Sequence, residues 1–441
     1  MRIISTGSRV AARALACAIP AAIAAGCAAP ATQWKGNLHT HSVWSDGTDY
    51  PEMVTQWYVD HGYAFLALTE HDLLQVGDRW VDINAPDTGW PPRNHSARRA
   101  LPGYRDRFGD WVQEHRDGDR HLVRLRPLAE YRSLFERPGR FLLLTGEEIT
   151  DRAGAHVNAF NLHTAILPRG GATGGERIRS NLAAVDEQRR GTAGEIAAIV
   201  NHPNFTWALT AEELAAIPAV RIFEVFNGHT MVNNAGDALH ASTERIWDVM
   251  LTLRHEAGLP PVFAAATDDA HDYREYGDTI SRPGRGWVMV RAPRLTAEDI
   301  GRALNRGDFY ASTGVRIRTE RCDGERLRIE IQPEPGATYR TYFIGTRRTT
   351  PLTSSPVVSA DGDTVRTTRK YDEGVGAVLM EVEGNTAEYG FRGDERYVRA
   401  KVVSSEAHVD PTTGREIGME SAWVQACFSQ RPVSRVGEAG D

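Results

Sequence analysis

The sequence has few cysteines and no excess of positive charge. Its 441 residues include only 4 cysteines, and 51 Lys and Arg are outnumbered by 58 Asp and Glu, which gives a formal net charge of -7. A mildly acidic surface disfavours binding to polyanions, so no nucleic-acid partner is expected, and a local basic pocket is the alternative. The hydrophobic fraction of 41% and the charged fraction of 25% are ordinary for a globular protein, and the length suits one large domain plus a smaller one.

A hydrophobic run long enough to span a bilayer is also missing. Three arginines precede an apolar stretch at 14–25, which is too short for a stable membrane anchor and is typical of an export signal. The stretch ends in Ala-Ala-Gly-Cys27, which resembles a bacterial lipobox. We therefore expect a lipoprotein signal over residues 1–26 and an exported protein, periplasmic or at the cell surface, anchored to the membrane only by lipid on Cys27. The alternative is simple secretion after cleavage at Ala31.

The scarcity of cysteine directs any metal chemistry to other ligands. If the signal is removed and Cys27 carries lipid, only Cys322 and Cys427 remain. Neither has a Cys or His neighbour at the spacing of a zinc site, so neither is interpreted as a ligand. In an exported protein the pair can form a disulfide, and two free buried thiols are the alternative.

Histidine, in contrast, is plentiful, with 15 residues. His39 and His41 follow the apolar Leu38, and in a strand residues i and i+2 point to the same face, so two imidazoles would project together. Asp46 follows on a turn marked by Gly47. Taken alone, the pattern favours two ordinary surface histidines near a turn.

The chain up to about residue 315 alternates between helical patterns and short apolar runs, and polar residues stand at the ends of the runs. The runs at 63–68, 141–145, 223–226 and 261–267 predict buried strands of a parallel α/β fold, in which catalytic groups lie at the carboxyl ends of strands. His229 is an intermediate case, at a strand end beside a Gly turn. The histidines and acids at the ends or starts of such runs are His39, His41, Asp46, His71, Glu148, His156, His202, Asp269 and His271.

Two segments depart from this alternation. Residues 73–139 are rich in Pro, Arg and Asp, and predict an insertion with helical pieces around 104–116 and 128–135, which either covers the site or is a solvated excursion. From about 316 short alternating runs separated by turn residues predict a β-sandwich-like module. The expected organisation is therefore one domain at 34–315 and a second, all-β module at 316–430.

Together the polar motifs resemble the PHP family, named for polymerase and histidinol phosphatase domains. The resemblance covers roughly residues 36–310. One departure is Asp268, where many relatives carry Ser, which places an extra carboxylate near the site. The motifs, in chain order, are His39-Thr40-His41 with Ser45-Asp46-Gly47, Thr69-Glu70-His71-Asp72, Gly146-Glu147-Glu148-Ile149, His156, Asn201-His202-Pro203 and Asp268-Asp269-Ala270-His271.

The resemblance implies a distorted (β/α)7 TIM-like barrel whose carboxyl strand ends hold two or three divalent ions, Zn²⁺, Mn²⁺ or Fe²⁺. The nine histidines and acids named above would be the ligands, a mixed set that suits these ions, and Glu148 would bridge two of them. The ions would activate hydroxide for hydrolysis. Asp72, Asn201, Glu224 and Asp268 would orient ligand histidines, and contact with substrate is the alternative for Glu224.

The reaction expected from the resemblance is hydrolysis of a small-molecule ester, first of all a phosphoester. Arg282 and Arg285 are candidates for reading phosphate, because Arg forks match phosphate oxygens, and backbone contacts within their loop are the alternative. A second branch of the family resembles carboxylic- and carbamate-ester hydrolases. Aromatic residues that would suit an apolar leaving group are Trp44, Trp80, Trp90, Trp207 and Phe226.

A function of another class is a non-catalytic, metal-stabilised surface lipoprotein whose β module binds a partner. The ligand set argues against it, because structural zinc needs only four closed ligands. The sequence does not define the oligomeric state.

Overall fold

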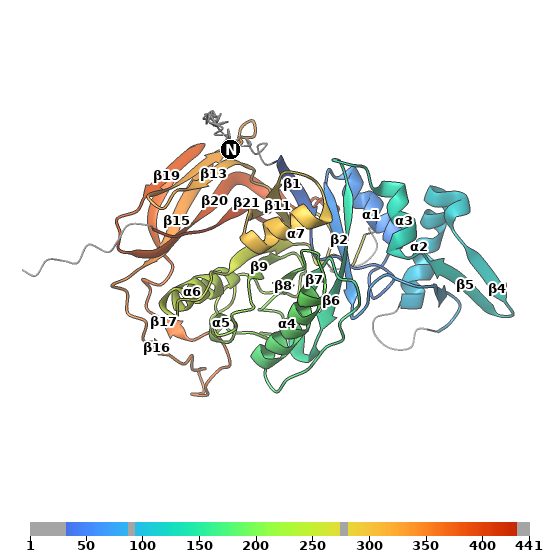
Figure 1. Cartoon of the computed structure of the whole chain (residues 1–441), viewed down its shortest axis with the longest axis horizontal. Helices are drawn as coiled ribbons and strands as arrows, with labels where there is room; N and C mark the ends of the chain where they lie inside the picture. The colour runs from blue at the N-terminus through green and yellow to red at the C-terminus, as the bar shows by residue number, and fades with distance from the viewer. Residues whose placement is uncertain (1–31, 87–92, 274–280, 430–441) are drawn as a thin grey trace, which may run out of the picture.

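The computed structural model describes residues 32–86, 93–273 and 281–429 (Figure 1). The expected signal at 1–26, the lipid site at Cys27 and the aromatic candidate Trp90 lie outside the described residues. One mixed sheet of 13 strands runs through the molecule. In spatial order its strands are β10 (Phe263–Thr267), β9 (Ile222–Asn227), β8 (Ala197–Val200), β7 (His156–Phe160), β6 (Leu142–Thr150), β2 (Phe65–His71), β1 (Thr32–Asn37), β11 (Trp287–Ala292), β12 (Phe309–Ser312), β21 (Glu416–Cys427), β20 (Glu395–Val409), β15 (Tyr339–Arg347) and β18 (Ala377–Glu383).

The N-terminal half of this sheet is mostly parallel, as the alternating pattern predicts. Strands β1, β2 and β6 pair in parallel, as do β8, β9 and β10, whereas β7 is antiparallel to both of its neighbours. An isolated parallel bridge joins Thr40, just after β1, to Ala270, just after β10. The two ends of this seven-strand run therefore meet where the predicted ligands follow the strands.

Two of the predicted strands are longer than their apolar runs. The ladder between β2 and β6 continues from Phe65 opposite Leu142 to His71 opposite Glu148. The apolar runs end at 68 and 145, and the sequence prediction placed the polar residues that follow them at the strand ends. These polar residues stay in the sheet because their backbone N–H and C=O groups pair between the two strands. Their side chains then point alternately to the two faces of the sheet.

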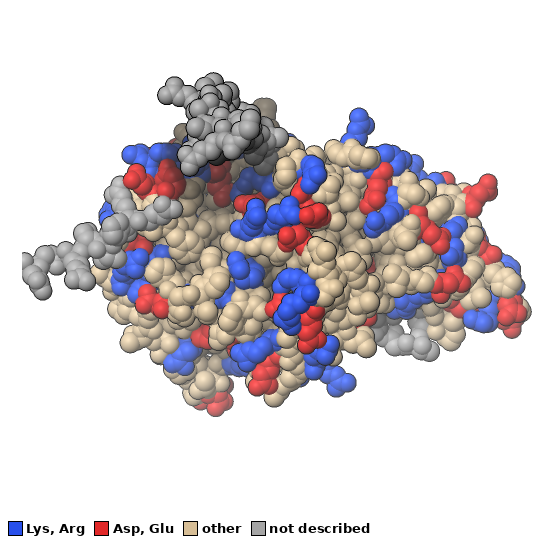
Figure 2. Space-filling model, in the orientation of Figure 1, with Lys and Arg blue, Asp and Glu red and all other residues tan. Residues whose placement is uncertain are grey.

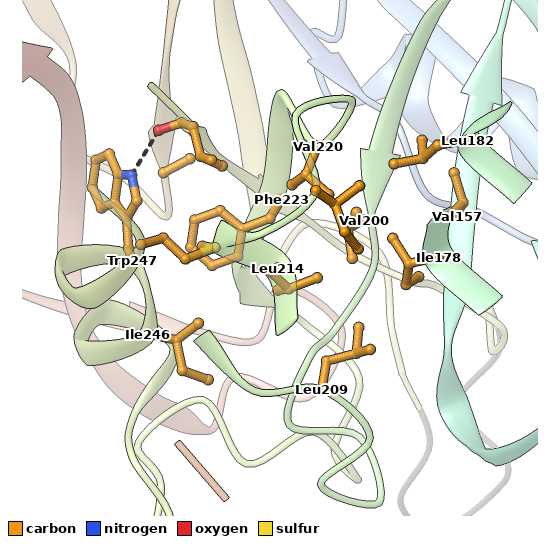
Figure 3. Close-up of a cluster of buried hydrophobic side chains, with 14 of the residues drawn as sticks. Val157, Ile178, Leu182, Val200, Leu209, Leu214, Val220, Phe223, Ile246 and Trp247 are labelled. Carbon is orange, nitrogen blue, oxygen red and sulfur yellow. Dashed lines mark hydrogen bonds between the residues drawn. The ribbon is translucent and has the colours of Figure 1, made fainter. Parts of the chain in front are cut away.

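Helices α1 (Pro51–Asp60), α4 (Gly174–Gly191), α5 (Ala211–Ala215), α6 (Thr243–Glu256) and α7 (Ala297–Arg306) pack on the N-terminal half of the sheet. A capping box of Thr210 and Glu213 begins α5. Figure 3 shows α4, α5 and α6 burying apolar side chains against β7, β8 and β9, and Trp247 Nε1 donates to the Val262 carbonyl at 2.8 Å. The labelled side chains of this core are Val157, Ile178, Leu182, Val200, Leu209, Leu214, Val220, Phe223, Ile246 and Trp247.

The segment predicted as an insertion forms one end of the molecule in Figure 1. Its elements are β3 (Arg79–Asp82), α2 (Arg93–Phe108), η1 (Gly109–Trp111), β4 (Glu114–Asp117), β5 (Arg120–Leu125) and α3 (Leu128–Phe135). The helix predicted at 128–135 is confirmed. The helix predicted at 104–116 is wrong beyond Phe108, because Gly109 takes a left-handed φ of 50° and the residues of β4 pair with β5 instead.

At the other end, strands β13 (Ile317–Cys322), β14 (Arg326–Ile331) and β19 (Thr386–Gly390) form a second sheet. Its apolar side chains share a core with β15, β20 and β21, so two sheets pack face to face. The short strands β16 (Ser354–Ser355) and β17 (Lys370–Tyr371) pair nearby. Because β12 pairs with β21, the large sheet crosses the boundary expected at residue 316.

A disulfide joins Cys322 at the end of β13 to Cys427 at the end of β21, so of the two alternatives for these cysteines the bond is present. Figure 2 shows basic and acidic side chains interspersed on the visible face. No helix in the described part of the chain is both long and apolar enough to cross a membrane.

Candidate metal centre

The structure brings all nine predicted ligands together. They form four overlapping groups, and within each group the potential ligand atoms lie within 4.8 Å of one another. The residues come from the segments that follow β1, β8 and β10, from β2 and β6, and from the first residue of β7. The groups are His41, Asp46, His71 and His271; His39, His41 and Glu148; His39, His202 and Asp269; and Glu148, His156 and His202.

The His39 ring is fixed from behind by a buried carboxylate. Its Nδ1 donates to Glu224 Oε1 at 2.8 Å, and its Nε2 lies 3.2 Å from Asp269 Oδ1. Glu224 Oε2 accepts from the His202 amide at 2.7 Å. Glu224 therefore holds one imidazole ring and the backbone of a second histidine, which leaves His39 Nε2 directed at the cluster.

His41 stands between the rings of His71 and His271, with ring centroids 4.5 and 4.2 Å away. Asp46 Oδ2 lies 3.1 Å from His71 Nε2 and 3.3 Å from His271 Nε2, so one carboxylate faces both outer rings. Burial and the charges of His271 and His71 lower the pKa of His41 to about 3. The His41 ring is therefore neutral, the form that binds metals.

Glu148 lies at the middle of the cluster. Its Oε1 is 2.9 Å from His156 Nδ1 and 3.4 Å from His202 Nε2. Its Oε2 is 2.9 Å from His71 Nδ1 and 3.5 Å from His41 Nε2. The two oxygens of one carboxylate thus face different groups of imidazoles, which is the arrangement of a bridging ligand.

Several polar atoms of the cluster are buried and make no hydrogen bond in the part of the chain that the structure describes. They include His39 Nε2, His41 Nε2 and Glu148 Oε2, the last of which has an ion-pair contact with His71 Nδ1 at 2.9 Å. A buried polar atom left unsatisfied costs about 1–3 kcal/mol, so such atoms are rarely left without a purpose. Two imidazole nitrogens and a carboxylate oxygen that converge in this way fit divalent cations of the Zn²⁺, Mn²⁺ and Fe²⁺ type.

The charges of the cluster are mutually compensated. Burial by itself would raise the pKa of Glu148, but the nearby charges of His39 and His71 outweigh it and hold that pKa well below its usual range. For His271 burial would lower the pKa, but Asp46 raises it to about 9. Protons on such histidines occupy positions that divalent cations would take, so metal binding would release protons.

Backbone strain is concentrated at the same place. Asp72, His202 and Asp269 have φ values of 55°, 21° and 49°, in or near the left-handed region. Non-glycine residues held there cost on the order of 1–3 kcal/mol each and persist where surrounding contacts fix them. The hydrogen bond from the His202 amide to Glu224 is one such contact.

A second buried acid, Glu70, positions the turn that carries Asp46. The hydroxyls of Ser42 and Ser45 donate to the two Glu70 oxygens, and the amides of the same residues donate to Glu70 Oε2 at 3.2 and 3.1 Å. Gln75 Nε2 donates to Glu70 Oε1 at 2.7 Å. The sequence prediction gave Glu70 no role. Its place one residue before His71 in β2, on the opposite face of the strand, was the available signal.

Asn227, at the end of β9, was also missed. Its Nδ2 donates to Glu224 Oε2 at 2.8 Å and to Asp269 Oδ2 at 3.1 Å. This side chain separates two carboxylates and leaves Asp269 Oδ1 facing the His39 and His41 rings. The bridging role of this amide is not recognisable in sequence, because Glu224 lies on the same strand but Asp269 follows another one.

The predictions for Asp268 and Arg285 need correction. Asp268 does not orient a histidine: its oxygens accept from the Tyr58 hydroxyl at 2.8 Å and from the amides of 284–286 at 2.7–2.9 Å, and burial raises its pKa to about 6. The Arg285 guanidinium donates to Asp410 Oδ2 at 2.9 and 2.6 Å and to the Gly228 carbonyl at 2.8 Å. Arg285 therefore links the site loop to the β20–β21 turn instead of facing a phosphate.

Asp72 and Asn201 lie one step further from the histidines than predicted. Asp72 Oδ1 accepts from the Thr150 amide at 2.7 Å, and the Thr150 hydroxyl lies 2.5 Å from His71 Nδ1. Asn201 Nδ2 donates to Glu148 Oε1 at 2.8 Å, so it orients an acid of the cluster. Arg282, the second phosphate candidate, is buried.

The aromatic candidates are mostly placed away from the cluster. Trp44 is buried in the core and donates to the Arg126 carbonyl, and Phe226 stacks on Trp423. Trp80 is exposed, and Trp207 stacks on His240 with ring centroids 3.9 Å apart. The aromatic ring beside the ligands belongs instead to Phe205, 5.1 Å from the His202 ring.

No family model matches the chain, and no curated protein does. Solved structures that resemble it include a two-domain protein from Bacteroides vulgatus containing a predicted PHP-like metal-dependent phosphoesterase, with 14% identity and a TM-score of 0.39 over 90% of this chain and 95% of that one. PsfC from Pseudomonas syringae has 14% identity and a TM-score of 0.32 over 62% and 87%. A candidate metal-dependent phosphoesterase from Bifidobacterium adolescentis has 14% identity and a TM-score of 0.26 over 58% and 94%. At this level of likeness, the functional assignment depends on the site residues.

Proposed function

We propose that the protein is a metal-dependent hydrolase of the PHP type, first of all a phosphoesterase acting on a small ester. The observation that carries the proposal is the convergence of buried ligand atoms that make no hydrogen bond among the described residues, namely His39 Nε2, His41 Nε2 and Glu148 Oε2. A closed structural zinc site uses four ligands, whereas nine ligands in four overlapping groups suit two or three ions. This argues against a purely structural metal.

The same proposal includes a distorted seven-stranded (β/α)7 barrel made by β1, β2 and β6–β10. It is supported by the bridge between Thr40 and Ala270 and by the His41 amide, which donates to the Ala270 carbonyl at 2.9 Å. Closing the run in this way gathers the carboxyl strand ends on one side, where a barrel enzyme carries its chemistry.

The chain's own residues prepare the site for hydrolysis. Divalent ions held by the nine ligands would polarise the ester and supply water of lowered pKa. Glu224 keeps the proton of His39 on Nδ1 and so directs the Nε2 lone pair inward. Asn227 holds one oxygen of Asp269 and leaves the other to the cluster. These hydrogen bonds fix the ligand set before substrate arrives, which is how enzymes avoid reorganisation during reaction.

The direct test combines metal analysis with a substrate panel on the purified full chain. We expect two or three Zn²⁺ or Mn²⁺ ions per chain and turnover of aryl phosphate mono- or diesters. Turnover should vanish in His39→Ala and Asp269→Asn, whereas His115→Ala, an exposed histidine in β4, is the matched control. One four-coordinate ion and no turnover of any ester would instead support the non-catalytic surface protein.

A second candidate reaction is hydrolysis of a carboxylic or carbamate ester at the same centre. It is favoured by the engagement of Arg285 with Asp410, which removes an expected phosphate contact, and by the Phe205 ring beside His202. Turnover of aryl acetates or aryl carbamates, with none of aryl phosphates, would select this reaction.

We further propose export and lipid anchoring at Cys27. The Cys322–Cys427 bond supports an oxidising compartment, where disulfides form and persist. Detergent-phase partitioning of the full-length protein that is lost on Cys27→Ser would support the anchor, whereas an aqueous-phase protein in both cases would remove it.

A further inference from the structure

His229 follows β9 and is held by two backbone contacts. Its amide donates to Asn227 Oδ1 at 2.8 Å, and the Met231 amide donates to its ring Nδ1 at 3.1 Å. The ring lies edge-on to His271, with centroids 5.4 Å apart. His229 is thus fixed at the margin of the cluster but belongs to none of its four groups.

The hydrogen bond from the Met231 amide decides which nitrogen of the His229 ring carries the proton. A backbone N–H can only donate, so Nδ1 of His229 must carry a lone pair, and the proton of the neutral ring is on Nε2. His39 has the opposite arrangement, because its Nδ1 donates to Glu224, which leaves Nε2 as the nitrogen that would give up its proton to bind a metal. His39 is therefore prepared to bind a metal through Nε2, whereas His229 is prepared to donate an N–H there.

The His229 Nε2 donor has no acceptor among the residues that the structure describes. Its loop is also held from the other end of the molecule. The carbonyl of Gly228 accepts from Arg285, and Arg285 is paired with Asp410 in the β20–β21 turn. The guanidinium expected to face the substrate thus holds the residue before His229 instead.

We propose that His229 is a catalytic residue that donates a hydrogen bond from Nε2 to an oxygen of the ester bound at the metal centre. The proposal rests on the proposed hydrolase function and adds the group that recognises the substrate oxygen. An anionic oxygen, such as that of a phosphate ester, is the preferred acceptor, because hydrogen bonds to charged groups are the stronger ones. No proton is transferred in this role.

The test uses two replacements of His229 in the full-length, metal-loaded protein. His229→Phe keeps a ring without an N–H, and His229→Gln keeps a side-chain N–H donor. His240→Phe, which alters a ring stacked on Trp207 away from the cluster, is the matched control. The measurements are metal content, the affinity for orthophosphate by calorimetry, and KM and kcat for the best ester.

We expect His229→Phe to keep the wild-type metal content and to bind orthophosphate about 10- to 100-fold more weakly. A matching loss in kcat/KM is expected, and His229→Gln should recover most of both. Loss of an ion in His229→Phe would make His229 a ligand and overturn the proposal. Orthophosphate binding by the wild type no tighter than by His229→Phe would overturn it as well.

The nitrogen signals of His229 give an independent readout. In ¹⁵N spectra of histidine-labelled protein, Nδ1 should have the shift of an acceptor and Nε2 that of an N–H, with metal bound or removed. The reverse tautomer would refute the argument. If no ester is turned over, the hydrolase function fails, while orthophosphate affinity and the tautomer still decide the role of His229.

Discussion

Replacing Glu224 by Gln should weaken metal binding at the centre while the protein stays folded. Glu224 is fully buried and accepts four hydrogen bonds, two on each oxygen. Oε1 accepts from His39 Nδ1 at 2.8 Å and Thr267 Oγ1 at 2.7 Å, and Oε2 accepts from the His202 amide at 2.7 Å and Asn227 Nδ2 at 2.8 Å. In Glu224→Gln, an NH₂ group must replace one oxygen.

The position of that NH₂ group can be worked out from the donors. The His202 amide and Asn227 Nδ2 can only donate, so they require the remaining oxygen. The NH₂ then faces Thr267, whose hydroxyl can turn to accept, and His39. His39 can accept only by moving its proton to Nε2, which removes the lone pair meant for a metal. Changes of this kind behind a ligand typically lower metal affinity 10- to 100-fold.

The assay is a chelator-competition titration with Zn²⁺ or Mn²⁺, followed by elemental analysis of the dialysed protein. Glu147→Gln is the matched control, because Glu147 lies on the other face of β6 and accepts from the Ile166 amide at 2.6 Å. Burial raises the pKa of Glu147 to about 8, so it is largely protonated at pH 7 and Gln resembles it. Wild-type affinity and metal content in Glu224→Gln would refute the tautomer argument.

Three further predictions concern stability. Burial raises the pKa of Glu52 from 4.5 to about 7, so the folded state binds more protons and the free energy of unfolding falls as pH rises through that window. Glu52→Gln should therefore raise the free energy of unfolding by on the order of 3 kcal/mol at pH 8 and change it little at pH 4, as measured by denaturant unfolding. Replacing Cys322 and Cys427 by Ser should lower the unfolding free energy by about 4–5 kcal/mol, since the bond closes a loop with a sequence separation of 105, and reductant should then have no further effect. Asp410→Ala should lower the free energy of unfolding by about 3–5 kcal/mol, because the Arg285 guanidinium stays buried without its ion-pair partner. An unchanged midpoint of urea unfolding would contradict this.

The ligands could be predicted from sequence because they follow apolar runs, and the ends of neighbouring strands meet. His39 and His41 follow β1, and Asp269 and His271 follow β10, so their order along the chain was sufficient. The fold class was predictable for the same reason, since alternating helical and strand patterns indicate parallel strands.

The supporting residues could not be predicted, because their roles depend on contacts between distant segments. Arg285 appeared to suit phosphate, but its partner Asp410 is 125 positions further along the chain. Asp268 looked like part of the site because it adjoins Asp269, but neighbouring residues can point in different directions. The tautomer of His229 depends on a single amide, that of Met231, which no composition or spacing reveals.

The uninterrupted sheet has a consequence for biosynthesis. Thr32 in β1 pairs with Ala292 in β11, and Ala311 in β12 pairs with Trp423 in β21. A nascent chain therefore carries its first strand for most of its synthesis before β11 appears, and β12 remains an open edge until β21 follows. An open strand edge is a site for wrong pairing, so these two edges are exposed to that hazard until their partner strands are made. The ligands of the metal centre all lie at or before His271, whereas Asp410, which holds Arg285 beside them, is among the last residues to be made.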